Sequence, residues 1–338
     1  MRILLVSQMY PGPDCPEFGS FVQSLERELL SRGHEIRRSV LTRRRSRTRF
    51  AKLLLDTRRQ AKRFYHDVIY AHFLCPAGVI AGMSSGAPLV VTSHGQDVAN
   101  IDWDRPLGRA FGHATKWVVE RATTIITVSD FLQRELHHKV PSSIGKTEVI
   151  NCGVDLNRFS VTQPPDGAPR FVCVGSLSER KNVIRLAEAF APLAARGWTL
   201  EFVGDGELRP ELVGRVGIEL VGSVPHDLVA DHLAQAHVVC QPSNREPFGL
   251  GALEGMASGR AVVGTLAGGH CEFIPTPEAG ILVDPNDVLA IRDALIAAAE
   301  MPCPNEAARL AAERHDIRVQ ATRIEAVLEH AVDEARTR

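Results

Sequence analysis

Two kinds of hydrophobic pattern alternate along this chain: short continuous apolar runs, and longer stretches with apolar residues three or four positions apart. The short runs are typical of strands buried in a parallel sheet, and the longer stretches are typical of helices. The expected strands cover residues 2–7, 67–71, 88–92, 125–129, 171–175, 200–206, 218–225, 238–241 and 261–265. The expected helices cover residues 20–32, 50–64, 183–195, 249–258, 287–299 and 314–338. Alternating strands and helices predict an α/β fold with parallel sheets.

A break in the alternation predicts two domains. Residues 160–169 are polar, contain three prolines and show no periodicity, so they are expected to form a linker. The predicted first domain covers residues 1–160 and the second covers 170–313, followed by the terminal helix 314–338. A chain of 338 residues is long enough for two cores of ordinary size.

Composition narrows the class of protein. The net charge of −1 gives no overall field that would attract nucleic acid. The seven cysteines are scattered without a CxxC pair, which favours small buried residues in a reducing compartment. The start of the chain looks like a first strand rather than a signal peptide, and every apolar run is shorter than the roughly 20 residues that span a bilayer. A cytoplasmic protein is therefore expected, with at most peripheral membrane contact.

One segment, residues 37–63, carries a strong local charge. It holds twelve arginines or lysines against a single acid, Asp56, and its second half has helical apolar spacing. An arginine-rich loop followed by a basic amphipathic helix is expected. Such a helix contacts an anionic acceptor or an anionic membrane surface, or is simply a solvated face. No aromatic residues are interleaved to stack on bases, so RNA is not expected.

Residues 237–272 carry the densest candidate chemistry. Glu246 precedes a predicted helix and Glu254 lies inside it, which separates them by up to about 12 Å. That distance is too long for two carboxylates that share one proton and suits two anchors of an extended ligand. Gly249 and Gly251 leave free backbone N–H groups at the helix N-terminus, where an anion is favoured. The alternative is one capping glutamate and one solvated glutamate.

This segment resembles the EX7E motif of retaining GT-B glycosyltransferases of family 4, whose typical text is PSxxExFGxxxxEAMAxGxPVVxxxxGGxxE. The matching positions are Pro242, Ser243, Glu246, Phe248, Gly249, Glu254, Met256, Ala257, Gly259, Val262, Val263, Gly268, Gly269 and Glu272. Gly255 and Ala261 replace the usual Ala and Pro. Three further segments resemble the family: residues 93–97 its HGxD turn, 149–159 its VxNGVDxxxF segment, and 175–182 its GSLxxRKG loop, with Ser176 where many members have Arg.

The resemblance implies two doubly wound, Rossmann-like domains facing across a cleft, an acceptor-binding first domain and a donor-binding second domain. It also implies a terminal helix that crosses back to the first domain. The implied reaction is retaining transfer of a hexose-type sugar from a nucleotide diphosphate sugar to an acceptor, without a metal or other cofactor. The implied catalytic residues are His94, Arg180, Lys181 and Glu246. The implied donor-binding residues are Gly19, Ser129, Gly175, Gly204, Val224, His226, Phe248, Gly249, Leu250 and Glu254.

Each cation and acid has an implied role. Arg180 and Lys181 would stabilise the departing diphosphate, Glu246 would hold sugar hydroxyls and Glu254 the ribose. His94 would lie beside the transferred sugar, with Asp97 either orienting it or capping the next segment. In the basic segment, acceptor or membrane contact is assigned to Arg43, Arg44, Arg45 and Arg47.

Two other functions stay open at this point. A nucleotide-sugar epimerase on the same fold would need acid and base residues in the cleft. A non-enzymatic module would use residues 37–63 to bind anionic lipid or polymer. A dinucleotide-binding fold is disfavoured because GxGxxG is absent after the first strand.

Overall fold

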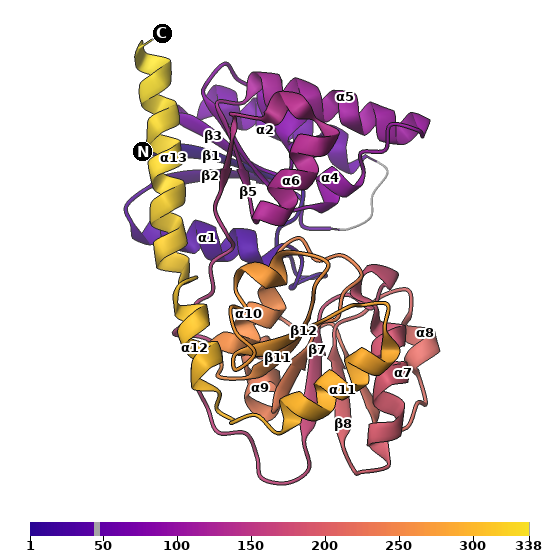
Figure 1. The fold of residues 1–338 in the computed structure, drawn as a ribbon. Coiled ribbons are helices and arrows are strands. Elements are labelled where there is room, and N and C mark those ends of the chain that lie inside the picture. The colour runs from indigo at the N-terminus through magenta and orange to yellow at the C-terminus, as the bar shows by residue number, and fades with distance from the viewer. Residues whose placement is uncertain (44–47, 338) are drawn as a thin grey trace. The chain divides into compact units, whose positions relative to one another are not determined.

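The computed structural model describes residues 1–43 and 48–337. These residues form two compact units (Figure 1). The first unit comprises Met1–Cys152 together with the C-terminal helix α13 (Ile317–Thr337), and the second comprises Gly153–Asp316. The chain enters the second unit eight residues earlier than the linker predicts. The cause is local pairing: the Val154 N–H donates to the His315 carbonyl at 2.8 Å, which ties the entry to the exit of that unit.

The described part of the first unit contains a six-stranded parallel sheet with the order β2-β1-β3-β4-β5-β6. Its strands are β1 (Arg2–Ser7), β2 (Glu35–Val40), β3 (Val68–His72), β4 (Leu89–Ser93), β5 (Thr124–Thr127) and β6 (Thr147–Val149). Its helices, besides α13, are α1 (Ser20–Ser31), α2 (Arg49–Arg63), α3 (Val79–Gly82), α4 (Gln96–Ala99), α5 (Pro106–Arg121) and α6 (Asp130–Lys139).

The second unit repeats this architecture, with a six-stranded sheet in the order β12-β11-β10-β7-β8-β9 among its described residues. Its strands are β7 (Arg170–Val174), β8 (Thr199–Val203), β9 (Ile218–Gly222), β10 (Val238–Cys240), β11 (Ala261–Thr265) and β12 (Gly280–Val283). Its helices are α7 (Val183–Ala194), α8 (Arg209–Leu212), α9 (His226–Gln235), α10 (Leu250–Ala257), α11 (Val288–Ala299) and α12 (Glu306–Glu313).

Apolar side chains from sheet and helices form a core in each unit. In the second unit, α7 and α11 pack Leu186, Phe190 and Leu295 against strand residues such as Phe171. In the first unit, α1 and the yellow helix α13 of Figure 1 pack on one side of the sheet. The predicted α/β class with two doubly wound domains is confirmed.

The predicted elements differ from the structure in several helices and at sheet edges, since α5, α9 and α12 were not predicted either. The strands β2, β6 and β12 lie at edges and were not predicted. The sequences of β2 (EIRRSV) and β6 (TEV) contain polar residues and lack the continuous apolar run of a central strand, whereas β12 (GILV) is apolar but has only four residues. Residues 37–40, expected in an arginine-rich loop, belong to β2, where Ser39 alone among them is fully buried. The expected helix 314–338 is α13, which begins at Ile317 after the separate helix α12.

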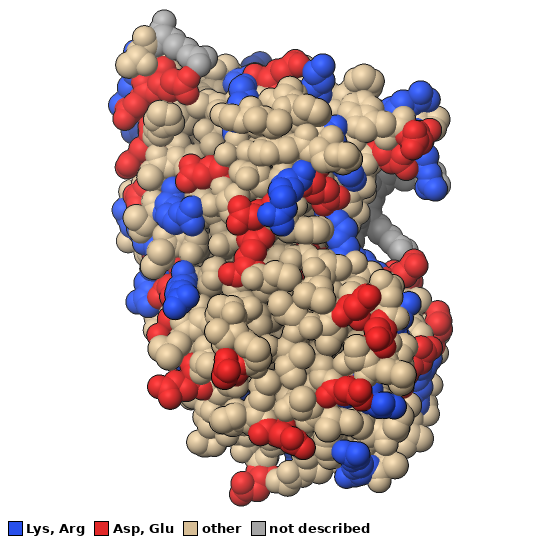
Figure 2. Space-filling view, in the orientation of Figure 1, with Lys and Arg blue, Asp and Glu red and all other residues tan. Residues whose placement is uncertain are grey.

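Charge is mixed over the surface. Acidic and basic side chains are interspersed on the face drawn in Figure 2, in keeping with the net charge of −1. Within residues 1–43 and 48–337, no helix combines the length and the apolarity needed to cross a bilayer.

Candidate active site

The sheet topology of the second unit creates a natural ligand site between β7 and β10. The chain runs outward through β7, β8 and β9, then returns to place β10 on the other side of β7. Loops leave the carboxyl ends of β7 and β10 in opposite directions at such a point, which opens a crevice where ligands bind in α/β sheets. The loop after β7 carries Arg180 and Lys181, and the loop after β10 carries Glu246.

Lys181 and Glu246 meet at this crevice. The Lys181 Nζ donates to Glu246 Oε2 at 2.6 Å, and the Ser243 hydroxyl donates to the same oxygen at 3.0 Å. Both charged side chains are almost fully buried. Backbone ties hold the two loops together, because the Asn244 N–H donates to the Arg180 carbonyl at 2.9 Å. The structure thus brings together two residues 65 positions apart in the sequence.

The Glu246 carboxylate keeps its charge despite its burial. Burial raises the pKa of Glu246, but Lys181, then Arg180 and His270, more than offset it and hold the pKa well below its usual range. Arg180 lies 3.7 Å from Glu246 Oε1 and donates to the Arg245 carbonyl at 3.3 Å, so it turns toward the carboxylate rather than into solvent. Two cations therefore converge on one carboxylate, a cluster that can receive an anionic group.

Helix α10 begins beside this cluster. Its N-cap residue, Gly249, has a φ of 108°, and a Cβ at this position would come within 2.1 Å of His270 Nε2. Glycine is required here both by the backbone conformation and by the packed imidazole. A Cβ on Gly251 would lie 2.5 Å from Gln241 Nε2, so a larger residue there would displace the Gln241 side chain. No acceptor in the described chain bonds the N–H groups of Gly249, Leu250 or Gly251.

His270 was not identified from the sequence. It is fully buried, and its Nδ1 accepts from the Thr265 N–H at 3.0 Å. Burial, above all, lowers the pKa of His270 to about 4, so the ring is neutral and carries its proton on Nε2. That Nε2 has no hydrogen-bond partner among the described residues. The only sequence signal was a polar residue just after the carboxyl end of a strand.

Glu254 lies on α10 and is 3% exposed, which excludes a solvated side chain. Its Oε1 accepts from His226 Nε2 at 2.7 Å, and His226 Nδ1 accepts from the Arg158 guanidinium at 2.9 Å. Arg158 also pairs with Asp227 at 3.2 Å. The structure thus brings the two predicted donor-binding residues Glu254 and His226 into contact, and adds Arg158, which the sequence did not single out.

Two predicted glycines allow a close approach of neighbouring strand ends. Gly175 follows β7 with a φ of 141°, and Gly204 follows β8 with a φ of 146°. A Cβ on Gly204 would lie 1.9 Å from the Gly175 carbonyl oxygen, and a Cβ on Gly175 would lie 3.3 Å from Lys181 Cε. These glycines shape the backbone under the Lys181 side chain.

Other predicted donor-binding residues make contacts that stabilise the fold. The Ser129 hydroxyl is buried and caps α6 by accepting from the Leu132 N–H at 2.9 Å. The Phe248 ring packs against Phe273 at 5.1 Å in the interior. Val224 lies half-buried in the loop between β9 and α9, and Leu250 is the half-buried first residue of α10.

Gly19 is the N-cap residue of α1. Its φ is 77°, and a Cβ there would lie 2.6 Å from the Met9 carbonyl. The backbone geometry and the packing against Met9 therefore both demand glycine at this turn after β1.

In the first unit, His94 follows β4 and contacts a second histidine. His94 Nε2 and His72 Nδ1 are 3.0 Å apart. Asp97 does not orient His94: its oxygens accept from the Ser93 hydroxyl and from the N–H groups of Gly95 and Leu74. Asp97 thus fixes the turn that carries His94. Neither alternative of the sequence interpretation agrees with these contacts, because Gly95 is the N-cap residue of α4 and no side chain caps that helix.

The basic segment is described in part. Arg43 is largely exposed and pairs with Asp14 at 3.1 Å. Arg44, Arg45 and Arg47 lie outside the described residues. The cations of α2 that are exposed are Lys52, Arg58, Arg59, Lys62 and Arg63.

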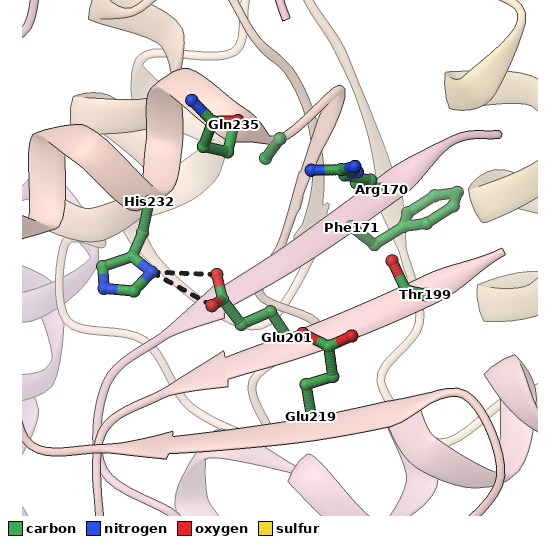
Figure 3. A pocket seen from close by; sticks show the side chains of 8 residues that line it. Arg170, Phe171, Thr199, Glu201, Glu219, His232 and Gln235 are labelled. Atoms are coloured by element: carbon green, nitrogen blue, oxygen red, sulfur yellow. Dashed lines mark hydrogen bonds and ion pairs between the residues drawn. The ribbon is translucent and has the colours of Figure 1, made fainter. Parts of the chain in front are cut away.

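A separate cavity of about 320 Å³ lies at the opposite end of the second sheet (Figure 3). Arg170 and Thr199 begin β7 and β8, whereas Lys181 and Glu246 follow the carboxyl ends of β7 and β10. Within the cavity, His232 Nδ1 bonds both oxygens of Glu201 at 3.0 and 3.1 Å. No group of three or more His, Cys, Asp or Glu side chains suited to a metal occurs within the described ranges.

Comparison with solved structures of known proteins defines the fold class of this chain. The chain resembles the sucrose-phosphate synthase of Thermosynechococcus elongatus with a TM-score of 0.79 and 19% identity, over 98% of both chains. It resembles Anabaena HepE in complex with UDP-glucose with a TM-score of 0.75 and 21% identity, over 98% of this chain and 100% of that one. The fold is therefore that of the GT-B glycosyltransferases.

Sequence comparison then gives the family. Residues 3–158 match the model described as Glycosyltransferase Family 4, and residues 168–301 match Glycosyl transferases group 1. D-inositol 3-phosphate glycosyltransferase of Kribbella flavida is 30% identical over 305 residues, covering 79% of this chain and 70% of that protein. The chain belongs to glycosyltransferase family 4, as its motifs predict, and it is a glycosyltransferase.

Proposed function

We propose that this glycosyltransferase moves a hexose-type sugar from a nucleotide diphosphate sugar to an acceptor hydroxyl, with retention of the anomeric configuration. The observation that carries the proposal is the buried cluster of Lys181, Arg180 and Glu246 at the crevice between β7 and β10. The structures of HepE with UDP and with UDP-glucose support a nucleotide-sugar donor, since they share the fold.

Each part of the cluster has a task in this proposal. Lys181 and Arg180 stabilise the negative charge that grows on the diphosphate as its bond to the sugar breaks. The unbonded N–H groups at the start of α10 add to this stabilisation. Glu246 accepts hydrogen bonds from sugar hydroxyls, and Glu254, held by His226, accepts from the ribose. His94 donates to or accepts from an oxygen of the sugar.

We propose a mechanism without a protein nucleophile and without a metal ion. The acceptor oxygen attacks the anomeric carbon on the face that the diphosphate leaves, and its proton passes to a diphosphate oxygen. Arg180 and Lys181 then stabilise the negative charge of the leaving diphosphate, as a divalent ion would otherwise do. The wild-type chain is therefore expected to keep its activity in excess EDTA.

Substitution at Glu246 tests the donor site. Glu246→Gln keeps the size of the side chain but removes its charge, and we expect turnover to fall by about 100-fold or more. Glu201→Gln is the matched control, because Glu201 lies in the separate cavity and its substitution should leave turnover near wild type. Equal activity in the wild type and Glu246→Gln would contradict the role of Glu246. A changed sugar after incubation with donor alone would indicate an epimerase instead.

A thermal-shift screen identifies the donor. UDP-, GDP- and ADP-sugars are compared with the corresponding nucleoside monophosphates. The true donor at 100 times its dissociation constant should stabilise the chain by about 2.7 kcal/mol. Lys181→Ala should abolish most of the difference between diphosphate and monophosphate, since the lysine is assigned to the diphosphate. A screen without any stabilising nucleotide sugar would refute the donor assignment.

We further propose that α2 contacts an anionic membrane surface. Its exposed cations are accompanied by an exposed apolar side chain, Leu55 at 67% exposure, and Tyr65, at 71% exposure, follows the helix two residues after its end. Cations attract anionic headgroups at about 1 kcal/mol each, and an apolar side chain can enter the interface. The variant Arg58→Glu/Arg59→Glu should lose binding to phosphatidylglycerol-containing vesicles in cosedimentation, whereas Arg196→Glu/Arg292→Glu in the second unit should not. Wild-type binding that is equal on pure phosphatidylcholine vesicles would contradict an electrostatic contact.

A further inference from the structure

A pair of histidines lies where the first sheet reverses its strand order. The chain runs from β1 outward to β2 and returns to place β3 on the other side of β1, so the carboxyl ends of β1 and β3 flank the switch point. His72 is the last residue of β3 and pairs in register with Ser7 at the end of β1. It is 1% exposed, and its Nδ1 lies 3.0 Å from Nε2 of His94, which follows β4.

Both rings are neutral near pH 7. Burial lowers the pKa of His72 to about 3. Burial and then the neighbouring His72 lower the pKa of His94 well below its ordinary value. Each ring therefore carries one proton, and a single N–H lies between the two nitrogens.

The surroundings of His72 decide which ring donates. Its other nitrogen, Nε2, is buried and has no hydrogen-bond partner among the described residues. If His94 were the donor, the His72 proton would be on this Nε2 and would be a buried N–H without an acceptor among the described residues, which costs free energy. If His72 is the donor, only a lone pair is left without a partner. The favoured arrangement puts the His72 proton on Nδ1.

The hydrogen bond from His72 also determines the tautomer of His94. His94 Nε2 accepts from His72, so the proton of His94 must lie on Nδ1. His94 is only partly buried, and no described group bonds its Nδ1. The free Nδ1–H is thus available to an oxygen of a ligand.

Packing holds the two rings in this geometry. Phe21 and Phe73 lie against His94, with ring centroids 4.5 and 4.8 Å away, and Tyr70 lies 4.6 Å from His72. Phe73 adopts a φ of 79° and a ψ of 132°, which a non-glycine residue rarely does. Such strain costs about 1–3 kcal/mol and occurs most often at functional sites.

We infer that His72 is a positioning residue, which donates its Nδ1–H to His94 Nε2 and so presents the Nδ1–H of His94 to an oxygen of the bound sugar. The assignment of a sugar oxygen rests on the proposed function. The tautomer of His94 does not, because it follows from the contacts of the chain alone.

Nitrogen NMR on the full-length chain tests the tautomer without any substrate. Long-range proton–nitrogen spectra of histidine-labelled protein distinguish a ring protonated on Nδ1 from one protonated on Nε2, and His94→Asn identifies the His94 signals by their loss. The wild type should show His94 protonated on Nδ1. In His72→Leu the fixed pattern should disappear and the Nε2–H form of His94 should gain population. A wild-type His94 protonated on Nε2 would overturn the inference.

Kinetics test the positioning role. The amide nitrogen of an asparagine can replace an imidazole Nδ1–H, so His72→Asn should recover most of the activity that His72→Leu loses. We expect kcat to fall about 10- to 100-fold in His72→Leu, with a much smaller change in the KM of the donor. In a His94→Ala background the His72→Leu change should have no further effect. Equal losses in His72→Leu and His72→Asn, with unchanged melting temperatures, would overturn the role of the donated proton.

The two assays separate this inference from the proposed function. If the wild type transfers no sugar from any donor, the proposed function fails, while the NMR result still decides the tautomer. If His94 has the expected tautomer but His72→Leu keeps full turnover, the positioning role is overturned although the transferase assignment stands.

Discussion

Charged and titratable side chains at the candidate active site are buried, and their neighbours determine their protonation. Glu246 is 5% exposed and stays ionised because Lys181, followed by Arg180, offsets the effect of burial on its pKa. His270 is in the opposite situation: burial keeps it neutral, and its single proton faces Gly249. A carboxylate, two cations and a neutral N–H therefore occupy one small region of the second unit.

The low pKa of His270 makes the stability of the chain sensitive to mild acid. The pKa is about 4 in the folded chain and 6.5 in an ordinary histidine, so the unfolded chain binds one more proton between these values. The contribution of His270 to the free energy of unfolding is complete above pH 6.5 and is lost as the pH falls toward 4, at up to about 1.4 kcal/mol per pH unit.

A variant tests this pH dependence. His270→Asn keeps an acceptor for the Thr265 N–H but does not titrate. Urea unfolding at pH 7, 6 and 5 should therefore show a smaller decrease in the free energy of unfolding for the variant. Parallel curves for the two proteins would contradict a buried neutral His270.

At the scale of elements, short turns after the strands determine where the functional side chains point. Asn182 is the N-cap residue of α7 and has a left-handed conformation, with a φ of 59° and a ψ of 31°. Its Nδ2 donates to the carbonyls of Pro242 and Pro285 at 2.9 and 2.7 Å. One side chain thus connects the loop after β7, which carries Lys181, to the loop after β10, which carries Glu246. The family has glycine here, and asparagine is the residue that best tolerates the same conformation.

Two substitutions at Asn182 separate its hydrogen bonds from its backbone conformation. Asn182→Gly loses the side-chain hydrogen bonds, whereas Asn182→Ala also incurs the cost of the left-handed conformation, about 1–2 kcal/mol. Chemical denaturation should therefore rank the wild type above Asn182→Gly, and Asn182→Gly above Asn182→Ala. Alanine and glycine variants of equal stability would show that the turn relaxes when the side chain is removed.

At the scale of the whole molecule, the chain returns to its first unit after completing the second. Helix α13 contacts α1, β3 and β4, and it buries Ile324, Leu328 and Ala331 in the core of the first unit. A salt bridge from Arg32 to Glu325 at 3.2 Å and a hydrogen bond between His34 Nε2 and Glu325 at 2.7 Å support this packing. The first unit is therefore built from two separate stretches of sequence, and the second from one.

This difference predicts how fragments fold. Residues 153–316 contain a complete core and should fold alone with a cooperative thermal transition. Residues 1–152 lack α13 and should leave part of the core exposed, which is expected to cause aggregation or binding of a hydrophobic dye. Addition of a peptide of residues 317–337 should restore a cooperative transition in that fragment. A stable 1–152 fragment without the peptide would show that α13 is dispensable for its core.

The sequence predicted strands best where a continuous apolar run reflects a strand that is buried on both faces of the sheet. The central strands, such as 238–241 and 261–265, are continuous apolar runs and were predicted within a few residues. The edge strands β2 and β6 were missed because polar residues interrupt their sequences, and the apolar β12 was missed although it resembles a buried strand. In the same way, Glu246, Lys181 and Glu254 stand at defined positions of the motifs, whereas His270 and Arg158 stand at variable positions of them and could not be singled out.

By itself, the sequence determined the fold class, the family and the principal charged residues, because strand burial and motif spacing are properties of neighbouring positions. Only the tertiary structure decided the partners of those residues. The contacts of Lys181 with Glu246, of His226 with Glu254 and of His72 with His94 join segments at least 22 positions apart. Which ring nitrogen holds a proton, and which carboxylate stays charged, depends on burial and on such distant neighbours, and these exist only once the chain has folded.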